Sequence, residues 1–259
     1  MRAAGVEEPR LDAELLLAEA TGWDRARLAA DPEAEIPPPA ARRFGEMVRR
    51  RLRREPVAYI LGRRGFRHLE LAVDPRVLIP RPETELLVEL ALELQPRRVL
   101  DLGTGSGAIA LAIAAELPGC EVIASDSSPA ALEVARANAE RLGLAARVEV
   151  VEATLPSDIG ELELIVANLP YVSEADWQGL EPEVTEWEPR EALLAGRDGL
   201  DVLRNAIPVA AGATPVLALE VGAGQDGAVG ELLKEAGFDE VETRFDLAGI
   251  PRVTIGRRA

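Results

Sequence analysis

The tetrapeptide Asn168-Leu169-Pro170-Tyr171 joins an amide, a rigid backbone and an aromatic ring. A planar amine or amide nitrogen is a poor nucleophile because its lone pair is delocalised. The side-chain carbonyl of Asn168 and the backbone carbonyl of Leu169 or Pro170 can accept its N–H groups, which orients the nitrogen and stabilises the positive charge it acquires. Pro170 stiffens the loop, and Tyr171 can pack against a flat target. These types favour in-line methyl transfer to a planar nitrogen, although a plain strand-ending turn also uses Asn and Pro.

A glycine-rich turn, Gly103-Thr104-Gly105-Ser106-Gly107, follows the apolar run Val99-Leu100-Asp101-Leu102. Glycines let the backbone turn tightly and approach a ligand without a Cβ clash. A helix starting after the turn offers free N–H groups to a polar ligand. Asp126 ends the next apolar run, where a carboxylate can accept hydrogen bonds from both hydroxyls of a ribose. The glycine turn and Asp126 are therefore predicted to hold a nucleoside cofactor.

The glycine turn alone does not separate a nicotinamide dinucleotide from S-adenosylmethionine, because it also satisfies the loose dinucleotide fingerprint. Asp101 favours S-adenosylmethionine, since an acidic group suits a cationic sulfonium and amino group better than a pyrophosphate. Glu152, near the end of the third predicted strand, is a candidate neighbour of the adenine. A nicotinamide enzyme would also need a hydride-transfer site, and the single His68 lies outside the predicted α/β region.

Short apolar runs alternate with helical patterns from Arg98 onward, which predicts a mostly parallel α/β sheet of the Rossmann-like type, covered on both faces. We expect seven strands, at residues 98–101, 121–126, 147–151, 162–168, 214–220, 240–246 and 251–256. We expect helices at 108–116, 129–142 and 225–236. The last two strands should pair as an antiparallel hairpin, because their connection is too short for a parallel crossover. Ligands of such sheets bind at the carboxyl ends of the strands, so the Asn168 loop should face the cofactor.

The first 60 or so residues show helical rather than strand spacing. One apolar stripe contains Leu11, Leu15 and Leu16, and a second follows the break at residues 37–39. We therefore predict a helical N-terminal domain at 1–64, which would dock the substrate. A β-hairpin linker at 65–79, with its turn at 74–76, and an α/β domain at 80–259 complete the predicted organisation.

Composition limits the function classes. The chain has 259 residues and a formal net charge of -16, which argues against broad, sequence-independent nucleic-acid binding. Its one cysteine, Cys120, excludes an internal disulfide framework. No apolar run approaches the roughly 20 residues that span a bilayer. Together these features favour the cytoplasm.

One dense basic stretch contrasts with the acidic whole. It consists of Arg42, Arg43, Arg49, Arg50, Arg51, Arg53 and Arg54. A solvated helix face would explain such a run. The alternative hypothesis is a surface that steers an acidic protein substrate.

The motif after the fourth strand resembles the Asn/Asp-Pro-Pro-Tyr signature of class I methyltransferases that act on planar nitrogen, with Leu169 in place of the first proline. Asn-Leu-Pro-Tyr is also similar to the motif of ribosomal RNA adenine dimethyltransferases, so this loop leaves adenine and glutamine both open. Further segments resemble the glutamine methyltransferases that modify peptide chain release factors. These are residues 59–62, Phe66, 77–85, 188–193, 196–201, 219–225 and 246–253.

The resemblance implies transfer of a methyl group from S-adenosyl-L-methionine to the side-chain amide nitrogen of the glutamine in the Gly-Gly-Gln motif of class-1 release factors. It implies that residues 103–107 and Asp126 hold the cofactor and that residues 168–171 hold the glutamine. The run from Arg81 to Glu85 would close over the cofactor or the substrate entrance. Leu169 keeps its backbone carbonyl, so we expect the chemistry to be retained.

Two rival substrates remain open at this point. A sister group methylates a glutamine of a large-subunit ribosomal protein by the same chemistry. An RNA or DNA adenine methyltransferase would need a basic face and salt-sensitive binding to nucleic acid.

Overall fold

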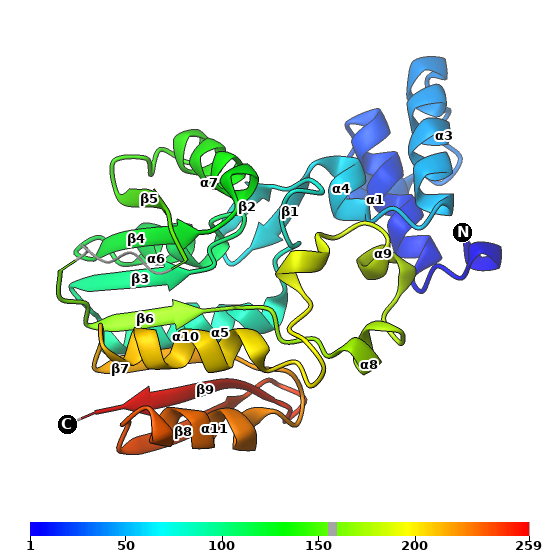
Figure 1. The fold of residues 1–259 in the computed structure, drawn as a ribbon. Coiled ribbons are helices and arrows are strands. Elements are labelled where there is room, and N and C mark those ends of the chain that lie inside the picture. The colour runs from blue at the N-terminus through cyan, green and yellow to red at the C-terminus, as the bar shows by residue number, and fades with distance from the viewer. Residues whose placement is uncertain (155–159, 259) are drawn as a thin grey trace. The chain divides into compact units, whose positions relative to one another are not determined.

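The computed structural model describes residues 1–154 and 160–258 (Figure 1). Contacts divide the chain into two compact units. One contains residues 1–63 together with 181–187, and the other contains residues 64–180 and 188–259. Among the described residues, no helix is both long and apolar enough to cross a bilayer.

The first unit is helical, as the sequence predicts. Its elements are η1 (Arg2–Ala4), α1 (Pro9–Thr21), α2 (Arg25–Ala30), α3 (Pro38–Leu52), α4 (Val57–Leu61) and α9 (Pro182–Thr185). Proline occupies the first position of α1 and α3, where its missing N–H is not needed. The break expected at residues 37–39 is therefore also the start of α3. Leu16, Met47 and Ile60 form the buried centre that joins α1, α3 and α4.

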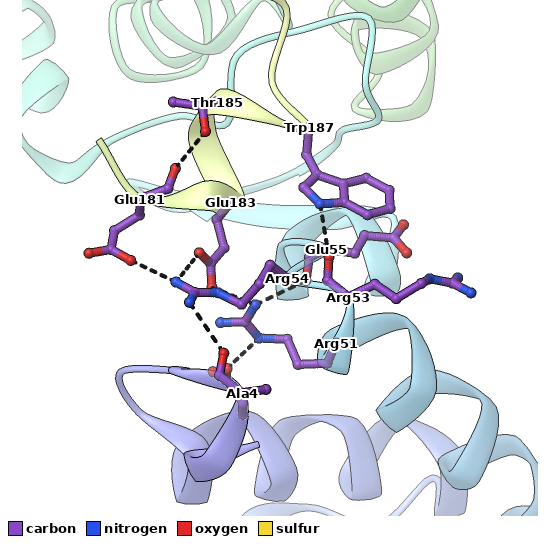
Figure 2. Close-up of polar contacts among 10 residues, drawn as sticks. Ala4, Arg51, Arg53, Arg54, Glu55, Glu181, Glu183, Thr185 and Trp187 are labelled. Atoms are coloured by element: carbon purple, nitrogen blue, oxygen red, sulfur yellow. Dashed lines mark hydrogen bonds and ion pairs between the residues drawn. The ribbon is translucent and has the colours of Figure 1, made fainter. Parts of the chain in front are cut away.

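Residues 181–187 belong to this helical unit although they follow the Asn168 loop in the chain. Arg51, whose side chain is only 7% exposed, binds Asp12 Oδ2 at 2.6 Å and Glu183 Oε1 at 2.7 Å. Arg54 binds Glu183 Oε1 through Nε at 2.7 Å and Glu181 Oε2 through Nη2 at 2.6 Å. Figure 2 shows both guanidinium groups turned toward the carboxylates of this segment. A buried charge without a partner is costly, and the segment supplies Glu183 as a carboxylate partner for the buried guanidinium of Arg51.

These contacts correct the hypotheses for the basic stretch. Arg51 is buried, and neither a solvated helix face nor a docking surface describes it. Arg50 is likewise bound to Glu55, at 2.9 Å from Nε to Oε2. Arg42, Arg43, Arg49 and Arg53 do lie exposed, and Arg43 forms an ion pair with Glu19. The basic stretch thus divides into arginines that build the unit and arginines that face solvent.

The predicted hairpin exists, but its turn lies elsewhere. β1 (Arg63–Phe66) and β2 (Leu69–Ala72) pair around Arg67, which adopts a positive φ of 50°. The turn expected at residues 74–76 joins no strands. Asp74 Oδ1 accepts hydrogen bonds from the backbone and side chain of Arg76. These local bonds stabilise a turn that no strand follows.

The second unit holds the predicted seven-stranded sheet, in the order β5-β4-β3-β6-β7-β9-β8. The strands are β3 (Arg98–Leu102), β4 (Glu121–Asp126), β5 (Val148–Glu152), β6 (Leu164–Ala167), β7 (Val216–Glu220), β8 (Glu240–Phe245) and β9 (Pro251–Arg257). The first five pair in parallel, and β9 runs antiparallel to both β7 and β8. The expected fold class and the C-terminal hairpin are confirmed.

Helices bury both faces of this sheet (Figure 1). They are α5 (Glu85–Leu94), α6 (Ala108–Glu116), α7 (Pro129–Arg141), α10 (Asp201–Ala211) and α11 (Asp226–Glu235), with short η2 (Pro82–Thr84), α8 (Glu174–Trp177) and η3 (Arg190–Ala192) in the connections. Alternate residues of β6 serve different cores. Leu164 and Val166 pack with α5 and α6, whereas Ile165 and Ala167 pack with α10 and α11. Because both faces of β6 are buried, a ligand can reach this strand only at its end.

Candidate active site

A cavity of about 310 Å³ lies where the parallel strands of the second unit end. The glycine turn after β3, Asp126 at the end of β4 and the loop after β6 all reach it. Eight residues singled out from the sequence line it: Gly103, Thr104, Gly105, Ser106, Asp126, Asn168, Leu169 and Pro170. The structure therefore brings the candidate cofactor and substrate residues to one place, as the rule for open parallel sheets predicts.

The glycine turn is shaped by what surrounds it. Gly103, Gly105 and Gly107 have φ values of 75°, 55° and 84°, which favour glycine. A Cβ on Gly103 would lie 2.9 Å from Leu169 Cδ2, so this glycine lets the two site loops approach each other. A Cβ on Gly105 would meet no atom within 4 Å, so its backbone stands open beside the cavity. This cradle suits a ligand that packs against bare peptide groups.

Asp126 is already ordered by backbone donors. Gly105 N–H donates to Oδ2 and Ser128 N–H donates to Oδ1, each at 2.9 Å. A carboxylate oxygen has a second acceptor site, so both oxygens can still take a ribose hydroxyl. The residues present therefore fit a nucleoside cofactor.

Asp101 lies beneath the glycine turn and is fully buried. Its Oδ2 accepts hydrogen bonds from Thr104 Oγ1 at 2.6 Å and from Ala110 N at 3.0 Å. Among the described residues, nothing binds its buried Oδ1. Burial raises the pKa of the Asp101 carboxyl to about 7, against the lowering effect of those two hydrogen bonds, and Asp126 adds to the rise. The Asp101 carboxyl is therefore partly protonated near neutral pH, and a cation bound nearby would favour its ionised form.

Asn168 and Tyr171 are both linked to one buried carboxylate. Glu220, at the end of β7, is 2% exposed. Its Oε2 accepts the hydroxyl of Thr84 at 2.6 Å and its Oε1 accepts the hydroxyl of Tyr171 at 3.2 Å. The amide Nδ2 of Asn168 donates to Thr84 Oγ1 at 3.1 Å. Two residues of the tetrapeptide thus share Glu220 as an anchor.

Tyr171 is held at its backbone as well. Gln225 Nε2 donates to the Tyr171 carbonyl at 2.9 Å, and Gln225 Oε1 accepts from Gly222 N at 2.9 Å. A Cβ on Gly199 would lie 2.3 Å from the Tyr171 carbonyl oxygen, so only glycine fits there. Burial and the neighbouring Glu220 raise the pKa of the Tyr171 phenol far above its usual range. The phenol therefore stays protonated and acts as a donor.

Besides Asp101, five residues singled out from the sequence as site residues are not part of the cavity wall. Gly107 caps α6 and packs against Leu111. Glu152 pairs in register with Asp126 at the end of β5 but points to solvent. Arg81 is bound to Glu188, and Glu85 accepts the backbone N–H of Arg67. Tyr171 faces Glu220, beside the cavity.

Two residues of this network have no individual role in the prediction from sequence. Thr84 lies within the run from Arg81 to Glu85 that is expected to close over the site, and Glu220 lies within a segment that carries only the family resemblance. Thr84 lines the cavity at the end of η2, and Glu220 lies behind it. A signal existed for Glu220, because it is a carboxylate at the carboxyl end of the otherwise apolar strand Val216–Glu220, where parallel sheets bind ligands. Thr84 carried no such signal, since a threonine at a helix start is ordinary.

Comparison with known proteins now gives the family. A model described as the PrmC N-terminal domain matches residues 1–62, and one described as the methyltransferase small domain matches residues 82–181. The release factor glutamine methyltransferase of Geobacter sulfurreducens is 43% identical over 98% of this chain and 91% of that protein. That of Moorella thermoacetica is 44% identical over 100% of this chain and 94% of its own. The chain belongs to the release factor glutamine methyltransferase family.

Solved structures support the same fold for this family member. The catalytic domain of human METTL16, solved with an RNA hairpin, superposes with a TM-score of 0.61 at 17% identity, over 72% of this chain and 74% of that one. The N-terminal domain of human METTL16, solved with SAH, gives a TM-score of 0.54 at 16% identity, over 72% and 75%. At these identities the likeness extends to the methyltransferase fold alone.

Proposed function

We propose that this enzyme transfers a methyl group from S-adenosyl-L-methionine to the side-chain amide nitrogen of the glutamine in the Gly-Gly-Gln motif of class-1 peptide chain release factors. The products are N(5)-methylglutamine, S-adenosyl-L-homocysteine and the proton that the amide nitrogen loses. One observation carries the proposal. A single cavity is lined by the open glycine turn, by Asp126 and by the planar-nitrogen loop Asn168-Leu169-Pro170. The relatives of this chain are release factor glutamine methyltransferases, which supports the release factor as the substrate class.

The residues of the glycine turn and Asp126 would hold the cofactor. Gly105 offers an open backbone, and Asp126 offers a free acceptor site on each oxygen for a ribose. When bound, S-adenosylmethionine supplies an electrophilic methyl group. Asp126 is an acidic group beside this turn, and a ligand that carries positive charge would favour the ionised form of Asp101, whose pKa burial raises to about 7.

The residues of the Asn168 loop would hold the glutamine. The side-chain carbonyl of Asn168 and the backbone carbonyl of Leu169 or Pro170 accept the two N–H groups of the target amide. These bonds orient the nitrogen toward the methyl group and stabilise the positive charge that develops on it. Pro170 and the packing of Leu169 on Gly103 keep the carbonyls in place. Tyr171 lies beside the cavity, and its hydroxyl bond to Glu220 anchors the end of the loop.

The direct test is incubation of the purified full chain with methyl-labelled S-adenosylmethionine and three separate substrates. These are a class-1 release factor, a large-subunit ribosomal protein and an RNA carrying an unpaired adenine. We expect label only on the release factor, and only at the glutamine of Gly-Gly-Gln. A release factor whose target glutamine is replaced by alanine is the matched control. Label on the ribosomal protein or the RNA in place of the release factor would refute the proposed substrate.

A further inference from the structure

The position of Glu220 raises a question that the proposed chemistry leaves open. Glu220 is 2% exposed, although ionised carboxylates are costly to bury. Its two oxygens each accept a hydroxyl, from Thr84 and from Tyr171. Neither hydroxyl donor is charged, so this is a different arrangement from the arginine-bound carboxylates of the helical unit. The hydroxyls that bind this buried carboxylate belong to residues at the site, so we ask what its charge does there.

The hydrogen bonds around Thr84 run in one direction. A threonine hydroxyl has a single proton, and an ionised carboxylate can only accept. The proton of Thr84 therefore points to Glu220 Oε2, at 2.6 Å. Its oxygen is then left as an acceptor, and it receives Nδ2 of Asn168 at 3.1 Å. The charge on Glu220 thus dictates which end of the Asn168 amide faces Thr84.

We propose that Glu220 and Thr84 are positioning residues, which fix the Asn168 amide with its nitrogen toward Thr84 and its carbonyl oxygen available to the substrate amide. This inference rests on the proposed function, in which the target is a primary amide. A flipped Asn168 would present N–H groups to the N–H groups of the target, and the orienting bond would be lost. The same carboxylate holds the Tyr171 hydroxyl, so one buried charge orders both ends of the tetrapeptide.

Protonation of Glu220 offers a way to disturb this order without mutation. A protonated carboxyl can donate to Thr84 Oγ1, and Thr84 can then donate to the carbonyl of Asn168, which permits the flipped amide. Burial raises the pKa of Glu220 to about 7, against the hydrogen bonds from Thr84 and Tyr171. The charged groups nearby are Glu83 of η2, which raises the pKa further, and Arg252 of β9, which lowers it. Arg252 is itself bound to Asp246 at 2.8 Å.

The test compares Thr84→Val, Thr84→Ser and Glu220→Gln with the wild-type enzyme on a release factor. Valine keeps the shape of threonine but lacks the hydroxyl that links Glu220 to Asn168. We therefore expect kcat to fall about 10- to 100-fold. Binding of S-adenosylmethionine, measured by calorimetry, should stay near that of the wild type, and Thr84→Ser should recover most of the lost kcat. Thr254→Val is the matched control, because Thr254 is fully buried on β9 and its hydroxyl has no partner among the described residues.

The dependence of kcat on pH distinguishes a loss of the Asn168 amide orientation from a general structural effect. In the wild type, kcat should fall as pH drops below about 7, where Glu220 becomes protonated. In Glu220→Gln, kcat should be low at every pH and this acidic limb should vanish. A wild-type kcat in Thr84→Val, or a flat wild-type profile between about pH 6 and pH 8, would overturn the inference; the second needs no variant to fold.

The two proposals fail separately. If the wild type does not methylate the release factor, the proposed function is wrong. If the wild type is active and Asn168→Ala is not, while Thr84→Val keeps full kcat, only the positioning role of Thr84 and Glu220 is wrong.

Discussion

Asn168 is the residue on which the proposed chemistry depends most directly. Removing its side chain by Asn168→Ala deletes one acceptor for the target amide but leaves the glycine turn and Asp126 intact. We expect kcat to fall by about 100-fold or more, the scale at which single transition-state hydrogen bonds act. Affinity for S-adenosylmethionine, measured by calorimetry, should change little. Turnover like that of the wild type would remove Asn168 from the mechanism.

The burial of Asp101 predicts how the free energy of unfolding depends on pH. Burial raises its folded-state pKa from 3.8 to about 7, so the folded protein binds the proton more tightly than the unfolded chain. The free energy of unfolding of the ligand-free protein should therefore decline as pH rises from about 4 to about 7. Asp101→Asn cannot ionise, so this decline should be shallower by about 1 kcal/mol or more. Urea unfolding at several pH values measures the difference.

A control is needed because other groups titrate in the same range. Glu220 contributes a decline of the same sign, which Asp101→Asn leaves in place. The exposed Asp31 provides a matched variant, Asp31→Asn, which should show the wild-type dependence on pH. If the free energy of unfolding declines equally with pH in Asp101→Asn and in the wild type, the pKa of Asp101 is not raised in the folded protein.

The residues of the site were predictable where local sequence carries the signal. The glycine turn, Asp126 and Asn168 follow buried strands, and the chain's alternation alone places such positions at one edge of the sheet. The hydrogen bond between Thr84 and Glu220 could not be predicted, because it joins positions 136 residues apart. A sequence shows the types of such residues but not which hydroxyl meets which carboxylate.

At the scale of elements, apolar patterning predicted the strands well. Expected and observed bounds agree for β4 and differ by at most two residues at either end of the other strands. Helix α10 was not predicted, and Pro208 lies within it. The hairpin turn was misplaced because Asp74-Pro75-Arg76 has strong turn chemistry but serves a local Arg76 contact instead. Turn-forming residues show where the chain bends, not which strands it joins.

The segment 181–187 is the element whose partners were least visible in the sequence. Glu183 binds Arg51 and Arg54, and these arginines with Asp12 complete the buried cluster. Burial alone would raise the pKa of the Glu183 carboxyl, but Arg54 and Arg51 outweigh it and lower the value. The cluster should therefore contribute stability above the unfolded-state pKa of 4.5 and lose it as pH falls through the lower folded-state value.

We expect Glu183→Ala to lower the free energy of unfolding near neutral pH by about 2 kcal/mol, because it leaves Arg51 with one carboxylate partner instead of two. Chemical denaturation of the full chain measures this, and limited proteolysis within residues 181–187 should become faster. Glu186→Ala, at an exposed position of the same segment, is the control and should change neither readout. Equal stability of the two variants would show that the ion-pair cluster contributes little.

For the molecule as a whole, the balance of charge is unfavourable to an acidic partner. The chain has 45 acidic and 29 basic residues, a formal net charge of -16, so an acidic protein is repelled at long range. Any attraction must come from a local excess of positive charge. Arg51 is buried, and Arg43, Arg50 and Arg54 are bound to glutamates. Arg42, Arg49 and Arg53 therefore remain as the exposed arginines of the basic stretch that are not bound in this way.

Reversing these three charges together, as Arg42→Glu, Arg49→Glu and Arg53→Glu, tests whether they steer the release factor. We expect KM for the release factor to rise about tenfold at low salt with kcat unchanged, because exposed charges affect encounter more than chemistry. The difference from the wild type should shrink as salt approaches the range in which such charges are screened. The same change in net charge at Arg64, Arg97 and Arg136, exposed positions of the sheet-containing unit, should raise KM far less. If both triple variants raise KM equally, the effect belongs to the overall charge of the molecule, and the basic stretch has no special part in docking.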